Sequence, residues 1–337
     1  MSVPQRYGIT FPFDGLSLLE QREIVQEIAA VGYTDLWSAE SGGYDAFTPL
    51  VVAAQWAPSL RLGTAIVPAY TRGAHTLAST VASACQAAPG RFALGLGTSS
   101  NVIVERWNGM SFDKPYQRMR DTIRFLRAAL SGEKVTEDYE TFSVKGFRLG
   151  ITVPEQPPIL VAALREGMLR LAGREGDGAI INWLSADDVK TVVPFVRAGR
   201  ETQAKPTGGE AQPESTRDVE IVARIFVLPV DDAGMARAVG KRAIASYLTV
   251  PVYAAFHEWL GRGEELADLW RLWKEGDRKA AAESIPDHVV DQLLVWGKPE
   301  ACREHLQRYI DNGVTTPAPA LFCGPDQLKP VINALKP

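Results

Sequence analysis

The chain has 337 residues, of which 46% are hydrophobic and 23% are charged, and its formal net charge is −4. This length and composition predict a soluble globular protein with a large core, built as one α/β barrel or as two domains. The weak negative charge offers no basic field to a nucleic-acid backbone, and no apolar run is long enough to cross a membrane.

The expected elements alternate between strand and helix along most of the chain. Short apolar runs predict strands at residues 7–11, 34–38, 60–67, 92–96, 158–163, 178–182, 219–228 and 313–321. Helical spacing or helix-start signals mark residues 16–31, 46–57, 75–88, 116–130, 168–172, 185–198 and 325–335.

Strands and helices that alternate about every 30 residues are typical of parallel βαβ units. Eight strands, each followed by a helix, predict a single (β/α)8 TIM barrel over residues 1–337. A doubly wound sheet is the alternative, but its glycine fingerprint would follow the first strand, and here the glycines follow the fourth.

Three segments depart from this alternation. Residues 133–150 are expected to form a small hairpin, and the polar, Gly- and Pro-rich residues 201–217 a mobile surface loop. Residues 232–296 form a mostly helical insertion between strands seven and eight, with four tryptophans. The insertion either packs against the outside of the barrel or forms a lid or wall over its mouth.

Missing motifs exclude several kinds of chemistry. The three cysteines are far apart, and the four histidines show no His-x-x-x-His or Cys-His spacing, so no metal site is expected. Neither a Gly-x-Ser-x-Gly elbow nor a nucleotide P-loop is present. The first residues lack the pattern of a signal peptide, which predicts a cytoplasmic protein. Because the chain shows no evident catalytic metal site or nucleophile, any reaction that it catalyses is expected to use an organic cofactor.

The active site of such a barrel lies in the loops after the strands. Gly95 and Gly97 end the fourth strand, and residues 98–101 then offer hydroxyls and backbone N–H groups. This stretch is either an anion-binding site or an ordinary capped turn between a strand and a helix. Glu40, after the second strand, is the candidate proton donor or acceptor, unless it only pairs with Arg72 or caps a helix. The candidates for a substrate pocket are Phe11, Trp37, Tyr44, Arg72 and Trp183.

Ordered motifs at these strand ends resemble a known superfamily. They are residues 36–47 (LWSAESGGYDAF), 62–68 with 70–72, 90–97, 104–109, 162–163 with 168–173, and 177–181. Together they resemble the luciferase-like monooxygenase superfamily, and most closely its deazaflavin branch, the coenzyme F420-dependent oxidoreductases. The resemblance covers most of residues 7–200 and is loose over residues 201–300.

The resemblance implies a binding site for coenzyme F420, an 8-hydroxy-5-deazaflavin. Ala65 and Ile66 fall where the family often has a non-prolyl cis peptide behind the ring. Two loops fall on phosphate-binding segments, and Glu40 falls where some members carry a histidine facing the ring. The implied coenzyme-binding residues are Ala65, Ile66, Gly97, Thr98, Ser99, Ala162, Ala163, Arg165, Glu166 and Gly167.

Two departures from the family pattern bear on these expectations. Leu164, Arg165 and Glu166 replace a small pair of residues after the two alanines. Arg165 could bind a phosphate or the acidic coenzyme tail, whereas Glu166 could repel that tail. Ser100 stands where sugar-phosphate dehydrogenases of the branch carry a catalytic glutamate, which speaks against that substrate.

The resulting hypothesis is an oxidoreductase that passes hydride between the deazaflavin C5 and a small organic substrate. Glu40 would supply or take the accompanying proton. One alternative is an FMN-dependent luciferase-like monooxygenase, and another is a non-catalytic coenzyme-binding barrel. The resemblance also implies a homodimer, while the substrate and the direction of transfer stay open.

Overall fold

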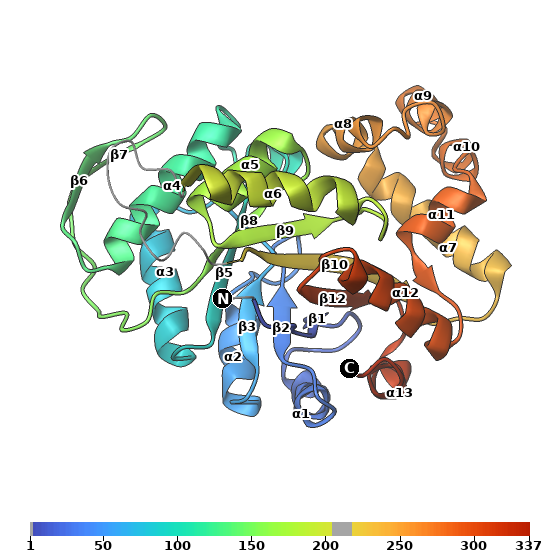
Figure 1. Cartoon of the computed structure of the whole chain (residues 1–337), viewed down its shortest axis with the longest axis horizontal. Coiled ribbons are helices and arrows are strands. Elements are labelled where there is room, and N and C mark those ends of the chain that lie inside the picture. The colour runs from blue at the N-terminus through green and yellow to red at the C-terminus, as the bar shows by residue number, and fades with distance from the viewer. Residues whose placement is uncertain (1–2, 204–217) are drawn as a thin grey trace.

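Eight parallel strands lie at the centre of the protein (Figure 1), and their order in the sheet arranges them as a ring. The structure is a computed structural model and describes residues 3–203 and 218–337, so most of the expected loop at 201–217 lies outside the described residues. In ring order the strands are β1 (Gly8–Thr10), β2 (Asp35–Ser38), β3 (Arg61–Thr64), β5 (Phe92–Gly97), β8 (Ile159–Ala162), β9 (Gly178–Asn182), β10 (Glu220–Leu228) and β12 (Thr316–Leu321). Arg6 N donates to Thr315 O at 2.9 Å and so joins the chain before β1 to the start of β12. The predicted TIM barrel is confirmed.

Helices cover the outside of this ring, one or more after each strand (Figure 1). They are α1 (Arg22–Ala30), α2 (Thr48–Trp56), α3 (Ala74–Ala87), α4 (Pro115–Leu130), α5 (Glu166–Glu175), α6 (Val189–Gln203), α12 (Pro299–Asp311) and α13 (Pro325–Ala334). A 3-10 turn (Leu19–Gln21) precedes α1, and a π-helical segment (Val102–Trp107) follows β5. The predicted hairpin is confirmed as β6 (Val135–Asp138) antiparallel to β7 (Ser143–Phe147).

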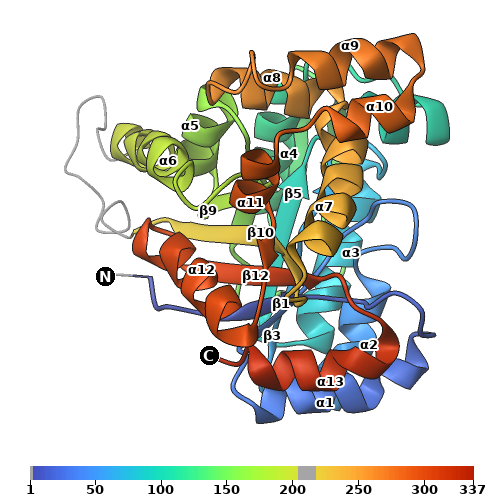
Figure 2. The same cartoon turned by 90° about the vertical axis from the view of Figure 1, so that its right-hand side faces the viewer.

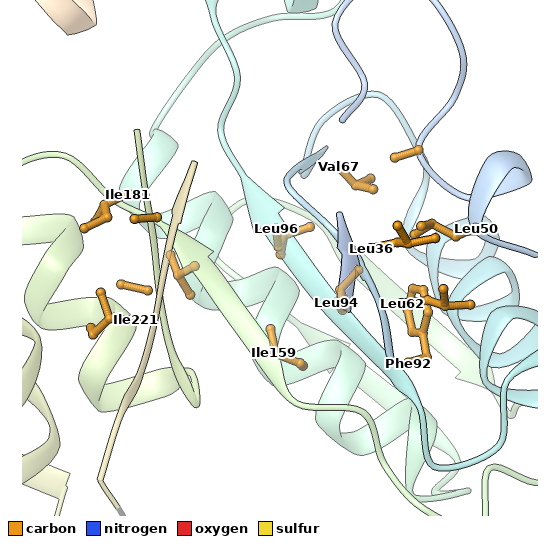
Figure 3. Close-up of a cluster of buried hydrophobic side chains, with 14 of the residues drawn as sticks. Leu36, Leu50, Leu62, Val67, Phe92, Leu94, Leu96, Ile159, Ile181 and Ile221 are labelled. Atoms are coloured by element: carbon orange, nitrogen blue, oxygen red, sulfur yellow. The ribbon is translucent and has the colours of Figure 1, made fainter. Parts of the chain in front are cut away.

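Side chains alternate between the two faces of each strand and so form two apolar layers, one outside the ring and one inside it. Outward-facing residues such as Leu36, Leu62 and Phe92 pack under the helices, where Figure 3 shows them beside Leu50 of α2. Inward-facing residues fill the barrel interior. They are Trp37, Ala93, Leu160, Ile180, Val222 and Ala318, with Ala65 and Ile66 packed against them.

An ion-pair network fills the N-terminal end of the barrel. Arg61 Nη2 lies 2.8 Å from Asp35 Oδ2, and Arg61 Nη1 donates to Glu220 Oε2 at 3.0 Å. Arg6 adds a second contact to Asp35 at 2.7 Å, and the Asp35 side chain is fully buried. These carboxylates and guanidinium groups satisfy one another, as buried charges must. Access to the barrel interior is therefore left to the C-terminal end.

The expected helical insertion follows β10. It contains α7 (Ala233–Leu248), α8 (Pro251–Trp259), α9 (Ala267–Glu275), α10 (Arg278–Glu283), α11 (Asp287–Leu293) and β11 (Val295–Trp296), which pairs with the end of β10. Figure 2 shows α8 and α9 at the end of the molecule opposite α1 and α13. His257 Nε2 lies 2.9 Å from Trp183 O, and Asn182 Nδ2 donates to Tyr253 OH at 3.0 Å. Because Asn182 ends β9, α8 forms a wall beside the barrel mouth.

Candidate functional site

A bulge at the end of β3 enters the barrel mouth. The chain leaves β3 at Thr64 and resumes as β4 (Val67–Pro68) beside the end of β5. The Ala65–Ile66 peptide bond between them is cis, as the resemblance predicted. Ile66 O accepts a hydrogen bond from Glu40 N at 3.2 Å, which joins the bulge to the loop after β2. Ala65 and Ile66 contact the barrel interior and stay partly exposed, so the bulge faces the open end.

The glycines of β5 leave the room that this bulge requires. A Cβ on Gly95 would lie 1.8 Å from Thr64 O, and a Cβ on Gly97 would lie 2.8 Å from Ile66 Cδ1. The Gly97 position also meets Ala162 of β8, at 3.1 Å between the two Cβ positions. Ile66, Gly97 and Ala162 therefore meet on one aliphatic surface at the mouth.

The turn after β5 carries the hydroxyl groups expected for an anion-binding site. Thr98, Ser99 and Ser100 are all partly exposed, and Ser99 has a positive φ of 62°. Ser100 Oγ accepts a long hydrogen bond from Ile103 N at 3.4 Å, which caps the turn. The capped-turn interpretation is thus observed for Ser100. Thr98 Oγ1 donates a long hydrogen bond to Ser99 O at 3.5 Å, and both residues stay partly exposed at the mouth.

The turn after β8 exposes the start of α5. Ala163 is buried, whereas Arg165, Glu166 and Gly167 are exposed. Among the described residues no side chain caps the α5 N-terminus, and a Cβ on Gly167 would meet none of their atoms within 4 Å. Glu166 pairs along the helix with Arg170 at 2.8 Å. The first N–H groups of a helix without a cap are donors suited to an anion.

Glu40 lies beside the bulge and makes both structural contacts considered from the sequence. Arg72 Nη1 lies 2.8 Å from each carboxylate oxygen, and Ala46 N donates to Oε2 at 3.4 Å. The Glu40 and Arg72 side chains are 21% and 18% exposed. The carboxylate therefore has a fixed orientation and keeps some access to solvent at the mouth.

The other predicted pocket residues divide by burial. Tyr44 is 42% exposed, whereas Phe11, Trp37 and Trp183 are each 1% exposed. Trp37 fills the barrel interior, Phe11 belongs to the main core, and Trp183 stacks on Phe226 with ring centroids 4.0 Å apart. In this conformation these three residues support the mouth from below or behind, and Tyr44 and Arg72 reach its surface.

Sequence reasoning missed Arg224, which also lies at the mouth. It stands within the otherwise apolar strand β10, EIVARIFVL, on the same face as the inward-facing Val222. A charge at an inward position of a buried strand is the signal that could have revealed it. Tyr253 of α8, close to it, could not be placed from the sequence because the position of the insertion was unknown.

Within residues 3–203 and 218–337 no group of three or more His, Cys, Asp or Glu side chains could hold a metal ion. The same residues contain no helix with the length and apolarity needed to span a membrane.

Comparisons with known proteins agree with the motifs. The family description "luciferase-like monooxygenase" matches residues 6–316. The chain is 26% identical to a 5,10-methylenetetrahydromethanopterin reductase of Methanolobus tindarius, over 89% of each chain. Its fold resembles the coenzyme F420-dependent tetrahydromethanopterin reductase of Methanopyrus kandleri, with a TM-score of 0.78, 18% identity and coverage of 99% and 98%. An F420-dependent secondary alcohol dehydrogenase matches with a TM-score of 0.77, 15% identity and coverage of 99% and 100%.

Proposed function

The chain belongs to the luciferase-like monooxygenase family, and we propose that it is a coenzyme F420-dependent oxidoreductase acting on a small organic substrate. The observation that carries the proposal is the aliphatic surface of Ile66, Gly97 and Ala162, bordered by two turns rich in free donors. The printed names of several relatives and structural neighbours support the choice of coenzyme.

The residues present fit such a coenzyme. A flat ring requires an apolar surface without bulky polar side chains. Ala65, Ile66 and Ala162 are aliphatic and partly exposed, so they can form such a surface. A phosphate requires N–H and O–H donors, which the α5 N-terminus and the Thr98–Ser99 turn supply. These donors follow neighbouring strands, β5 and β8, and so lie at the same edge of the barrel.

When bound, coenzyme F420 supplies or accepts a hydride at its C5 carbon. The protein's part is to hold the ring against the bulge, exclude water and orient the substrate. We assign to the Glu40 carboxylate the proton that accompanies the transfer, and to Arg72 the orientation of that carboxylate across their 2.8 Å contact. Tyr44 and Arg72 would face the substrate, with Phe11, Trp37 and Trp183 as the packed support.

Titration with coenzyme F420, and separately with FMN, followed by tryptophan fluorescence, tests the proposal. We expect tight binding of coenzyme F420 alone. Preference for FMN would instead indicate an FMN-dependent monooxygenase. Coenzyme F420 binding with no turnover on any acceptor would indicate a non-catalytic binding barrel.

A paired substitution tests the phosphate position. Gly167→Asp adds a carboxylate at the uncapped α5 N-terminus, where its Cβ meets no described atom within 4 Å. The coenzyme affinity should fall about tenfold or more through charge repulsion, with little loss of stability. Gly150→Asp is the matched control, since its Cβ is equally free in the loop before β8. Equal affinities of the two variants would place the phosphate elsewhere.

The finer expectations of a homodimer and a cytoplasmic location are part of this proposal and rest on the resemblance and on composition. Sedimentation of the purified protein over a range of concentrations tests the dimer.

A further inference from the structure

Arg224 occupies the level of the barrel mouth, on the side opposite the bulge. It is paired in register with Asn182, the last residue of β9, and with Ala318 of β12. Val222, two residues earlier, lies in the barrel interior, so the Arg224 side chain is also directed inward. In the ring of eight strands β10 stands four places from β3, which is the opposite side.

The Arg224 guanidinium has no anionic partner. Within residues 3–203 and 218–337 it makes no hydrogen bond or ion pair, and its Nε is buried without a partner. Its guanidinium lies over the ring of Phe226, 4.7 Å from Cζ to the ring centroid. By contrast, Arg61 at the other end of the barrel contacts two carboxylates. Because a half-buried guanidinium is costly without an anion, the missing partner of Arg224 is best supplied by a ligand.

Neighbouring groups complete an anion site around Arg224. Tyr253 OH accepts from Asn182 Nδ2 at 3.0 Å and keeps its own proton for donation. Burial raises the pKa of the Tyr253 hydroxyl, and the nearby charge of Arg224 acts in the opposite direction, so the hydroxyl stays a donor at neutral pH. Phe226 is 2% exposed and stacked on Trp183, so it belongs to the packed support under the Arg224 guanidinium.

The coenzyme leaves this side of the mouth free. The proposed ring support belongs to β3, and the proposed phosphate donors follow β5 and β8, which are the next two strands in the ring. None of these groups comes from β9 or β10. A ligand held on the β9–β10 side would therefore face the coenzyme across the mouth, which is where a substrate must lie to react with it.

We propose that Arg224 binds the anionic group of the substrate, and that the substrate is an organic acid. This inference rests on the proposed function. The anionic group is a carboxylate or a phosphate, because both accept paired hydrogen bonds from a guanidinium. Arg224 is thus a residue that determines substrate class, and it takes no part in the proton transfer assigned to Glu40.

Binding of simple aromatic probes tests the inference. Benzoate, phenyl phosphate and the neutral benzamide are titrated into the protein with and without coenzyme F420, and tryptophan fluorescence is followed. Trp183, stacked on Phe226, is one of the eight tryptophans that contribute to this signal. We expect one of the two anions to bind at least tenfold more tightly than benzamide, and the better anion identifies the group.

Substitutions assign that preference to Arg224. Arg224→Met should weaken anion binding by about 10- to 100-fold and leave benzamide and coenzyme F420 affinities within about twofold. Arg224→Lys retains the charge and should keep part of the preference, even if the methionine variant folds poorly. Arg242→Met, at an exposed arginine of α7, is the matched control and should change none of these affinities.

Each result decides between two statements. Equal binding of all three probes, or an unchanged anion preference in both Arg224 variants, overturns the inference. Loss of coenzyme F420 affinity in Arg224→Met without loss of anion preference would also overturn it, by assigning Arg224 to the coenzyme. Anion preference that depends on Arg224 in a protein that does not bind coenzyme F420 would uphold the anion site and refute the proposed function.

Discussion

Gly97→Ala adds one methyl group between the two segments that form the proposed ring support. The new Cβ would lie 2.8 Å from both Cγ1 and Cδ1 of Ile66 and 3.1 Å from Ala162 Cβ. Carbon atoms in contact prefer separations of about 3.5–4.0 Å. Ile66 must therefore move or β5 must shift, and overpacking of this kind costs about 1–3 kcal/mol.

A second substitution identifies the source of that cost. Ile66→Ala removes both crowding atoms, and by itself should cost about 1–2 kcal/mol because Ile66 is only partly buried. In the double variant the crowding by Ile66 is absent and the 3.1 Å approach to Ala162 Cβ remains, so the total cost should be smaller than the sum of the single costs by about 1–2 kcal/mol. Gly95→Ala is the contrast, since its Cβ would lie 1.8 Å from the backbone atom Thr64 O, which no side-chain truncation relieves. Its cost should exceed about 4 kcal/mol and be unaffected by Ile66→Ala.

Urea unfolding of the single and double variants, with unchanged m-values, measures these free energies. Coenzyme F420 affinity, measured in parallel, should fall about tenfold in Gly97→Ala because the surface under the ring is displaced. Additivity of Gly97→Ala and Ile66→Ala within about 0.5 kcal/mol would refute the packing of Ile66 over Gly97.

Three further substitutions test separate parts of the molecule. Glu40→Gln should lower turnover by about 100-fold or more with coenzyme affinity nearly intact, and unchanged turnover in steady-state assays would remove Glu40 from the mechanism. Burial lowers the pKa of His257 from 6.5 to about 4, so the unfolded chain binds the proton first and stability falls as pH drops from about 6.5 towards 4. The free energy of unfolding should fall by about 2 kcal/mol near pH 5 because of His257. In the His257→Gln variant, urea unfolding at each pH should not show this part of the fall. Arg61→Met should cost about 3–5 kcal/mol in urea unfolding, because buried Glu220 loses its guanidinium and Asp35 keeps only Arg6, yet it should leave coenzyme affinity unchanged, since Arg61 lies at the closed end of the barrel.

Strand and helix positions were largely predictable because their signals are local. The expected strand at 92–96 is β5 (Phe92–Gly97), and the expected last helix at 325–335 is α13 (Pro325–Ala334). Boundaries moved where side chains cap a turn. The helix expected from 46 starts at Thr48, because Asp45 Oδ1 accepts from Phe47 N and Thr48 N at 2.9 Å each.

The candidate site was predictable in part, for the same reason. Gly97, Thr98 and Ser99 follow a strand end that the local pattern marks, and the cis bond at Ala65–Ile66 came from motif resemblance. The sequence alone left open whether Glu40 is free or paired, and the structure supplies its contact with Arg72, 32 residues away. The exposure of Trp183 was equally undetermined, since Phe226 and Tyr247, which cover it, come from later elements.

The sequence by itself determined the barrel, because an eightfold alternation of buried strand and amphipathic helix has few other ways to bury its apolar faces. Only the tertiary structure decided which charges are satisfied. Arg61 meets Glu220 across 159 positions of the chain, whereas Arg224, in the same kind of buried strand, meets no carboxylate among the described residues. Periodicity is a property of neighbouring residues, but the pairing of a charge depends on which distant strands close the barrel beside it.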